Sequence, residues 1–268
     1  MNLALTPEQE LLRDTFAELF ATESSPERLR RAEESGFDAE LWRRLAETGA
    51  LGIRVLEEHG GAGLGLLEAT ILLYEAGRRL ATGPLAESIV ACRLLAELGD
   101  PGLLSNAMSG DAVVSLVLPA PDENAERLVA GGCEASAAVA RRGDEVVLVR
   151  RPANARDARN LGAPGLACWP VGERDIEVLA IGPRATDLFE AALEEWKLLT
   201  ASYVAGLSRE ALRIAAAYAT DRIQFDRPIG TFQAVAHPLA DAVTEVDAAL
   251  LLVHEALWAI DRGRPDAA

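Results

Sequence analysis

The sequence predicts an α+β protein with an N-terminal helical domain, a small middle β domain and a C-terminal helical bundle. Two observations support this class. Apolar residues recur at helical spacing in the first hundred residues and again after about position 185, whereas the middle holds short β-branched runs broken by Gly, Pro and Asp. Helices and strands are grouped and do not alternate, which argues against βαβ units. We expect the domains to cover residues 1–110, 111–184 and 185–268.

The N-terminal domain carries clear helix signals. Thr6 and Gln9 enclose Pro7 in the pattern of a capping box, with proline at the first helical position. The apolar stripe of this first helix consists of Leu12, Phe16, Leu19 and Phe20. Further helices are expected over residues 26–34, 38–48, 66–80 and 85–98, with Asp38 as an N-cap.

The middle and C-terminal parts follow different periodicities. Strands are expected over residues 112–118, 135–140, 145–151 and 176–181, and the Pro- and Gly-interrupted stretch 154–172 is expected to be a loop. Helix returns at about Ala185. Between Leu239 and Ile260, apolar residues step alternately by four and three, which predicts a long helix packed on another helix, in the core or at an oligomer interface.

Composition excludes several classes of function. The 268 residues include 26 Lys and Arg against 42 Asp and Glu, and this net charge of -16 argues against nucleic acid or an acidic membrane as partner. The N-terminus lacks the pattern of a signal peptide, and no apolar run reaches the length of a membrane span, so a cytoplasmic location is expected.

Metal and nucleophile chemistry find little support. The cysteines have no CxxC spacing and are expected to be buried, the histidines have no ligand spacing, and there is no GxSxG motif. We therefore name no metal ligand and no catalytic residue. The residues concerned are Cys92, Cys133, Cys168, His59, His237, His254, Ser202 and Ser208.

A glycine-rich stretch, EEHGGAGLG at residues 57–65, lies between two expected helices. Its glycines could let a backbone approach a ligand, but a tight turn with positive φ angles is the plainer interpretation. No strand precedes the stretch and no phosphate-loop lysine follows it, which excludes a dinucleotide or nucleoside-triphosphate fingerprint.

The stretch RIQFDRPIGTFQ, residues 222–233, follows the end of an alanine-rich helical run. In one interpretation Arg222 complements the C-terminal helix dipole, and Pro228 to Gly230 make a turn. In the other, the guanidinium fork of Arg222 binds a diphosphate, Gln224 and Gln233 donate amide hydrogen bonds, and Phe225 forms an apolar wall.

These residues resemble a family signature. The pattern R-x-Q-F-x-R-P-I-G-x-F-Q-A-V-x-H-x-L-A-D, residues 222–241, is similar to that of acyl-CoA dehydrogenases, and the stretch from Leu51 through the glycine-rich turn to E-A-G-R-R-L-A is similar to a segment of their N-terminal domain. The order of the three expected domains is also that of the family, so the resemblance spans nearly the whole chain.

The resemblance implies α,β-dehydrogenation of an acyl-CoA substrate with FAD at a subunit interface. A carboxylate takes the α-proton, and the β-hydrogen leaves as hydride. Arg222, Gln224, Phe225 and Gln233 take the places of family residues that contact the FAD of a neighbouring subunit. The implied partners are a homologous acyl-CoA dehydrogenase subunit and, as electron acceptor of the complex, an electron-transfer flavoprotein.

The chain also departs from the family pattern. The usual catalytic glutamate lies in a later helical segment, whereas only 46 residues follow Arg222, so the C-terminal domain is expected to be incomplete. An alternative base position, 26 residues before the arginine, is Trp196 here, with Glu194 and Glu195 on other helix faces. The β region lacks the stretch T-E-P-x-A-G-S-D and the family's tryptophan-threonine flavin contacts; only Leu118 to Pro121 remains near that place. Asp226 replaces a common glycine.

Three hypotheses follow. The chain is a subunit of a hetero-oligomeric acyl-CoA dehydrogenase that lends FAD contacts to a catalytic partner chain; or a truncated ordinary enzyme, which reading the gene past codon 268 would decide; or a non-enzymatic scaffold or regulatory subunit. The shortened β region hints at a bulky acyl group such as a steroid side chain. Glu194 and Lys197 align with the family's substrate side and are candidate substrate-binding residues.

Overall fold

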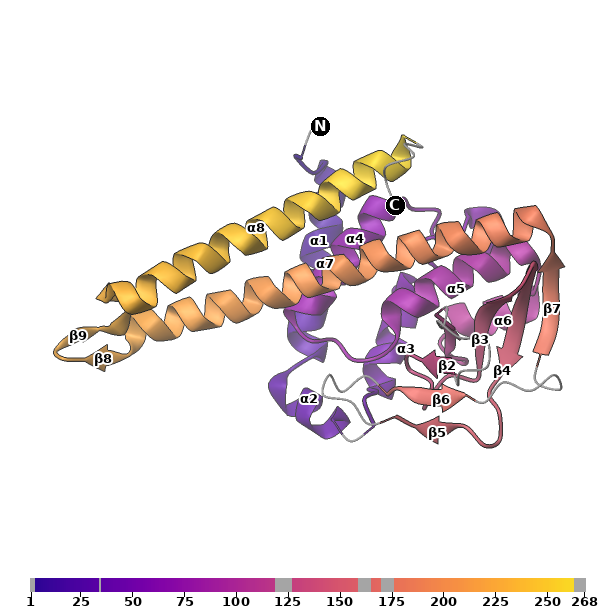
Figure 1. Cartoon of the computed structure of the whole chain (residues 1–268), viewed down its shortest axis with the longest axis horizontal. Helices are drawn as coiled ribbons and strands as arrows, with labels where there is room; N and C mark the ends of the chain where they lie inside the picture. The colour runs from indigo at the N-terminus through magenta and orange to yellow at the C-terminus, as the bar shows by residue number, and fades with distance from the viewer. Residues whose placement is uncertain (1–2, 34, 119–126, 159–164, 170–175, 263–268) are drawn as a thin grey trace. The chain divides into compact units, whose positions relative to one another are not determined.

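The computed structural model (Figure 1) describes residues 3–33, 35–118, 127–158, 165–169 and 176–262. The helices are α1 (Pro7–Glu23), α2 (Pro26–Ala32), α3 (Ala39–Glu47), α4 (Leu66–Arg78), α5 (Leu85–Leu98), α6 (Pro101–Met108), α7 (Pro183–Asp221) and α8 (Gln233–Asp261). The strands are β1 (Val114–Leu116), β2 (Arg127–Val129), β3 (Ala137–Arg142), β4 (Glu145–Arg150), β5 (Arg156–Asp157), β6 (Ala167–Trp169), β7 (Ile176–Ile181), β8 (Ile223–Gln224) and β9 (Arg227–Pro228). Within the described residues, no helix has the length and apolar character needed to cross a membrane.

The α+β class is confirmed, and the local signals explain where several helices begin. The backbone amide of Thr6 donates to Gln9 Oε1 at 3.0 Å, and the amide of Gln9 donates to Thr6 Oγ1 at 3.3 Å, which is the reciprocal geometry of a capping box. Asp38 accepts from the amides of Glu40 and Leu41 at the start of α3. Helix α6 was missed, although Asp100 caps it and Pro101 opens it.

The chain forms two compact units, and each is described by itself. One consists of residues 23–69 and 82–197 and contains the strands β1 to β7. The other consists of residues 1–22, 70–81 and 198–268. It contains nearly all of α1, the second part of α4, the C-terminal part of α7, and α8. Helices α4 and α7 each contribute residues to both units.

The strand-containing unit holds a four-stranded sheet of order β1-β3-β4-β7 and a three-stranded sheet of order β2-β6-β5. Strands β3 and β4 form a hairpin, whereas β1 pairs with β3 in parallel. Helix α5 packs on β1, and the Ser88 hydroxyl donates to the Val114 carbonyl at 2.6 Å. This side-chain bond satisfies a buried strand carbonyl and links the helix to the sheet.

The expected loop over residues 154–172 is wrong where β5 and β6 occur. Strand β6 pairs with β2, about forty residues away along the chain, and Trp169 is fully buried with its indole donating to the Gly132 carbonyl at 3.1 Å. Such long-range pairing leaves no local periodicity in a strand of three residues. The remaining residues of that stretch, 159–164 and 170–172, and residues 119–121 of the middle region lie outside the described residues.

In the other unit, the second half of α4 meets α7 at a pair of glycines. A Cβ atom on Gly77 would lie 1.9 Å from the Tyr203 carbonyl oxygen, and one on Gly206 would lie 2.0 Å from the Tyr74 carbonyl oxygen. The Ser202 hydroxyl donates to the Thr70 carbonyl at 2.8 Å in the same contact. The backbones of the two helices therefore approach so closely that only glycine fits at both positions.

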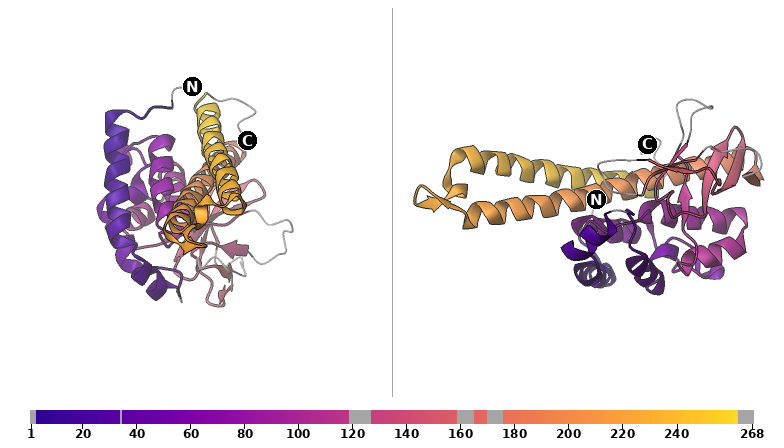
Figure 2. Two further views of the ribbon diagram at one scale, coloured as in Figure 1. Left: turned by 90° about the vertical axis from the view of Figure 1, so that its left-hand side faces the viewer. Right: turned by 90° about the horizontal axis from the view of Figure 1, so that it is seen from below.

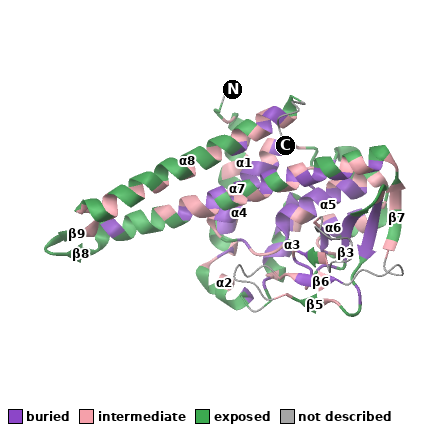
Figure 3. Cartoon of the chain, viewed as in Figure 1, coloured by how far each residue is buried: buried purple, intermediate pink, exposed green. Residues whose placement is uncertain are grey.

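Helix α8 runs antiparallel beside the C-terminal part of α7, as Figures 1 and 2 show from three directions. Arg209 on α7 forms an ion pair with Asp247 on α8. Of the apolar stripe expected on α8, Val253 and Leu257 are buried, whereas Val243 is 40% exposed. The stripe is therefore core toward the C-terminal end of α8 and open surface toward its N-terminal end, where green predominates in Figure 3.

Candidate functional site

The predicted diphosphate motif covers the short β-hairpin between α7 and α8, labelled β8 and β9 in Figure 1, and ends at Gln233, the first residue of α8. Gln224 pairs with Arg227, and the two residues between them, Phe225 and Asp226, have φ angles of 52° and 62°. Two successive left-handed residues are typical of the type I′ turn that suits a two-residue hairpin. The turn was expected at Pro228 to Gly230, but it lies earlier, at Phe225 and Asp226. The pairing of β8 with β9 imposes it on these two non-glycine residues.

The four predicted cofactor-binding residues are all displayed to solvent. Arg222, Gln224 and Gln233 are exposed, and Phe225 is 85% exposed. Among the residues that the structure describes, none of the three polar side chains has a hydrogen-bond partner. The Ile229 amide donates to the Arg222 carbonyl at 2.9 Å and so closes the hairpin behind the arginine. The hairpin thus presents one guanidinium and two amide groups that folding of this chain does not use.

Two further residues shape this hairpin and were not singled out from the sequence. The guanidinium of Arg227 lies 4.2 Å from the centroid of the Phe232 ring, within cation-π distance. Phe232 in turn meets Phe225 edge to face, with ring centroids 6.0 Å apart. This stack gives the exposed Phe225 a defined position. Both residues are visible in the motif as its second arginine and second phenylalanine, but their contact depends on the folded hairpin.

The donors of the hairpin fit an anionic, diphosphate-containing group. A guanidinium binds phosphate oxygens through two parallel N–H bonds, and each glutamine amide can donate to a further oxygen. The exposed carboxylate of Asp226, in the turn itself, is the one feature of the hairpin that opposes an anion. One arginine and two amides offer several donors against one carboxylate that water screens, so these residues fit a diphosphate.

Replacing Asp226 by glycine is expected to strengthen anion binding by the hairpin. Glycine adopts a positive φ without strain, and loss of the negative charge removes roughly 1 kcal/mol of repulsion, or about fivefold in affinity, if water screens the charge. The measurement is the dissociation constant for FAD of the protein in its assembled form. Asp226→Asn separates the two causes, because asparagine tolerates the left-handed region but carries no charge. Equal affinities for all three proteins would show that Asp226 does not face the bound anion.

The alternative base position holds no free carboxylate. Trp196 occupies it and donates its indole N–H to Glu87 Oε1 on α5 at 2.9 Å. The adjacent Glu195 is 8% exposed and is held by two arginines: Oε1 lies 2.7 Å from Arg54 Nη2, and Oε2 lies 2.9 Å from Arg93 Nε. Both carboxylate oxygens of Glu195 are therefore engaged by guanidinium groups from other segments of the chain.

The two candidate substrate-binding residues contact each other on α7. Lys197 Nζ lies 2.6 Å from Glu194 Oε1, and the lysine side chain is 60% exposed. This is the ordinary spacing of a surface ion pair along a helix. Contact with substrate is untested for both, so their binding role stays a prediction.

The glycine-rich turn closes on its own chain. Gly60 and Gly63 have φ angles of 84° and 63°, and a Cβ on Gly61 would lie 2.2 Å from the Val55 carbonyl oxygen. The Leu64 carbonyl at the end of the turn accepts from Arg54 Nη1 at 3.0 Å. These glycines therefore serve the tight turn and tie it to the arginine that pairs with Glu195.

Thiol and metal chemistry gain no support from the described residues, among which no three His, Cys, Asp or Glu side chains gather in a group that could hold a metal. Burial raises the pKa of Cys92 to about 12 and that of Cys133 to about 11. The expectation that all three cysteines are buried is wrong for Cys133 and Cys168, which are only half-buried. The Cys133 thiol, in the segment after β2, donates to the carbonyl of Leu166, the residue before β6, at 3.2 Å.

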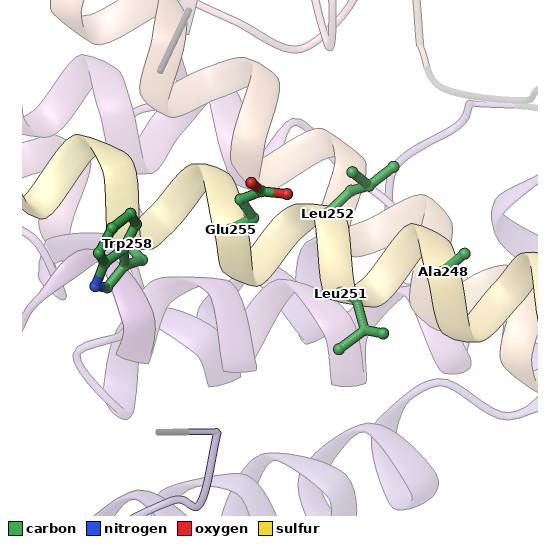
Figure 4. A pocket seen from close by; sticks show the side chains of 5 residues that line it. All are labelled: Ala248, Leu251, Leu252, Glu255 and Trp258. Atoms are coloured by element: carbon green, nitrogen blue, oxygen red, sulfur yellow. The ribbon is translucent and has the colours of Figure 1, made fainter. Parts of the chain in front are cut away.

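Helix α8 also carries an open, largely apolar pocket on its surface. Ala248, Leu251, Leu252, Glu255 and Trp258 line it, and Figure 4 shows their side chains projecting from one stretch of the helix. Leu251 and Leu252 are 49% and 63% exposed. Exposed leucines grouped in this way are typical of a surface that another protein covers.

Comparison with known proteins places these features in a family. Residues 6–104 match the model of the acyl-CoA dehydrogenase N-terminal domain, and residues 186–268 match that of the acyl-CoA dehydrogenase C-terminal domain. The first match contains α1 to α5, and the second contains most of α7, the hairpin and α8. The two matched segments leave the middle strands between them.

Individual relatives agree with these matches. Acyl-CoA dehydrogenase IpdE2 of Mycobacterium tuberculosis is 34% identical over 262 residues, 95% of this chain and 78% of that protein, and its namesake of Mycolicibacterium smegmatis is 30% identical over 259 residues, 94% of this chain and 78% of that protein. Among solved structures, the ChsE4-ChsE5 complex of M. tuberculosis superimposes with a TM-score of 0.82 at 26% identity, over 98% of this chain and 80% of that one. The chain belongs to the acyl-CoA dehydrogenase family.

Proposed function

We propose that this chain is a subunit of a flavin-dependent acyl-CoA dehydrogenase in which a homologous partner chain carries the catalytic base. In this assembly, the hairpin of β8 and β9 binds the diphosphate of an FAD held mainly by the partner. The proposal combines two features of the chain: exposed candidate donors for a diphosphate, and an alternative base position filled by an indole.

The observation that carries the proposal is the exposure of Arg222 and Gln224 at the β8–β9 hairpin and of Gln233 at the start of α8, where none of the three side chains has a hydrogen-bond partner among the described residues. A buried arginine or glutamine would serve the core, but a fully solvated set contributes little to folding. Such a set gains its value when a ligand or a neighbouring chain desolvates it. The open apolar pocket of α8 supports a neighbouring chain on the same helical pair.

Each of the hairpin residues has a defined task in this proposal. The Arg222 guanidinium neutralises and orients the diphosphate, Gln224 and Gln233 donate amide hydrogens to it, and Phe225 excludes water beside it. FAD, when bound, supplies the hydride acceptor for α,β-dehydrogenation. The proton at the α carbon goes to a carboxylate of the partner chain, because Trp196 fills the alternative base position and both oxygens of Glu195 are already paired with Arg54 and Arg93.

A bulky acyl-CoA of the steroid side-chain type is the proposed substrate, with an electron-transfer flavoprotein as the final acceptor of electrons. Support for the substrate class comes from a solved structure named as a steroid ACAD (acyl-CoA dehydrogenase), which superimposes on this chain with a TM-score of 0.85 at 29% identity. The ChsE4-ChsE5 structure, a complex of two differently named chains, supports a hetero-oligomer. A cytoplasmic location remains part of the proposal.

The test is Arg222→Ala in the chain co-expressed with the acyl-CoA dehydrogenase of a neighbouring gene. Loss of a hydrogen-bonded charge pair costs about 1.5–3 kcal/mol, so the affinity of the complex for FAD is expected to fall roughly 10- to 100-fold. The measurements are the flavin absorbance of the purified complex and its oligomeric state. Arg213→Ala, an exposed arginine also on α7, is the matched control.

Two outcomes would contradict the proposal. In the first, the chain purifies alone and leaves the partner's flavin content and turnover unchanged. In the second, the complex forms but Arg222→Ala retains full flavin occupancy. The second outcome favours the other candidate function, a scaffold or regulatory subunit, for which the carboxylate of Asp226 in the turn is the supporting observation.

A further inference from the structure

The hairpin of β8 and β9 carries a second arginine, Arg227, to which the proposed function gives no role. Its side chain is exposed, and among the residues that the structure describes it forms no hydrogen bond and no ion pair. Its guanidinium instead lies 4.2 Å from the centroid of the Phe232 ring. A cationic side chain is thus held in one place while its charge stays unpaired.

The register of the hairpin places Arg227 beside the predicted donors. Arg227 pairs with Gln224, and Pro228 pairs with Ile223. Directly opposed residues of an antiparallel pair share one face, and successive residues alternate between the two faces. The side chain of Arg227 therefore lies on the face of Gln224, whereas Ile223 and Pro228 belong to the opposite face.

The same ladder extends to Arg222. The Ile229 amide donates to the Arg222 carbonyl at 2.9 Å, which is the next hydrogen-bonded position after the pair of Gln224 and Arg227. Arg222 is thus two residues before Gln224 on the same face and is the diagonal neighbour of Arg227. Such neighbours lie about 7–8 Å apart, within reach of long side chains, so the two arginines can converge on one ligand.

The contact with Phe232 connects Arg227 to the third predicted donor. Gln233 directly follows Phe232 and is the first residue of α8. A guanidinium that stacks on a ring through its flat face keeps the N–H groups of its edge free for phosphate oxygens. Arg227 thus lies opposite the donor on β8 and against the neighbour of the donor on α8, with its own donors unused.

The charges on this face favour a ligand with two anionic groups. Arg222 and Arg227 are both exposed cations without an ion pair among the described residues, and two like charges at this spacing repel each other. The carboxylate of Asp226 offsets one positive charge at most. A diphosphate, which carries a negative charge on each phosphate group, replaces the repulsion by two attractive contacts.

We propose that Arg227 is a second cationic ligand of the FAD diphosphate, so that Arg222 binds one phosphate group and Arg227 binds the other. The inference rests on the FAD-binding function proposed above and assigns a further residue to that site. Phe232 is a positioning residue, because its ring holds the guanidinium of Arg227 by the face. The second cation also offsets the carboxylate of Asp226 beside the bound anion.

The test measures the dissociation constant for FAD of the complex of this chain with its partner, after removal of its flavin, by quenching of flavin fluorescence. Arg227→Gln removes the charge and keeps a polar side chain. At about 0.1 M NaCl it is expected to weaken binding about tenfold, the equivalent of one charge-assisted hydrogen bond. At about 1 M NaCl, where the screening length falls from about 10 Å to about 3 Å, this difference is expected to shrink.

Two further variants separate charge from position. Arg227→Lys keeps the charge but loses the flat guanidinium, so it is expected to retain part of the affinity and the same sensitivity to salt as the wild type. Phe232→Leu keeps both arginines but loses the ring, so it is expected to weaken binding similarly at both salt concentrations, because salt does not screen an apolar contact.

Arg262→Gln is the matched control. The Arg262 guanidinium also lies over an aromatic ring, 5.2 Å from the centroid of Trp258, but at the other end of α8. Its loss is expected to leave both the affinity for FAD and the effect of salt unchanged. Circular dichroism checks that every variant is folded.

The outcomes separate this inference from the proposed function. If Arg222→Ala weakens FAD binding but Arg227→Gln does not, the second cationic ligand is overturned and the proposed function stands. A loss in Arg227→Gln that is equally large at both salt concentrations also overturns it, because a purely structural role predicts that result. A complex that binds no FAD overturns both. A salt-sensitive loss in Arg227→Gln that Arg227→Lys partly restores supports both.

Discussion

Glu195→Ala is expected to lower the free energy of unfolding by about 3–5 kcal/mol. The substitution leaves Arg54 and Arg93 without the carboxylate that each contacts, at 2.7 and 2.9 Å. The two arginine side chains are only 19% and 13% exposed, and Arg54 Nε and Arg93 Nη2 already lack a hydrogen-bond partner among the described residues. Arg93 keeps its ion pair with Glu97 at 2.8 Å, but Arg54 becomes a largely buried cation without a counter-ion among the described residues, which costs far more than the loss of one surface pair.

Urea unfolding followed by circular dichroism measures this effect, and Glu194→Ala is the matched control. Glu194 is the preceding residue on α7 but pairs with the exposed Lys197, so its loss is expected to change stability by less than about 1 kcal/mol. Similar losses for both variants would mean that Arg54 and Arg93 find other partners or reach solvent when Glu195 is absent.

Gly77→Ala is expected to destabilise the unit formed by α1, α8 and the adjoining parts of α4 and α7 by at least about 2 kcal/mol. Its Cβ atom would lie 1.9 Å from the Tyr203 carbonyl oxygen and 2.7 Å from the carbonyl carbon, so backbone atoms must move apart. In a helix interior with free space, the same substitution stabilises by about 1 kcal/mol. A decrease in the free energy of unfolding therefore indicates the close contact between α4 and α7, whereas an increase indicates free space at Gly77.

Gly102→Ala provides that comparison. Gly102 lies exposed in α6, where a Cβ atom would meet only Asp100 Oδ1, at 3.8 Å. Thermal unfolding of both variants is the measurement, with a neutral or higher midpoint expected for Gly102→Ala and a lower one for Gly77→Ala. Stabilisation by both substitutions would contradict the approach of α4 and α7 at this point.

The order of elements could be predicted because its signals are local. The capping box of Thr6 and Gln9 and the cap at Asp38 act within three residues of themselves, so sequence alone places the starts of α1 and α3. The motif around Arg222 is also contiguous and could be recognised without a structure. By contrast, β5 and β6 depend on pairing with a distant strand, which no periodicity in two or three residues can reveal.

The sequence by itself determined the class of fold, the family resemblance and the candidate diphosphate donors, because each depends on residues that are neighbours along the chain. Only the tertiary structure decided what the acidic residues of α5 and α7 do. Glu195 and Trp196 are adjacent in sequence, yet helical geometry turns one toward two arginines and the other toward Glu87. Those partners come from segments more than a hundred residues away, so folding gives the two glutamates different surroundings: Glu195 pairs with two arginines, whereas Glu87 accepts from an indole.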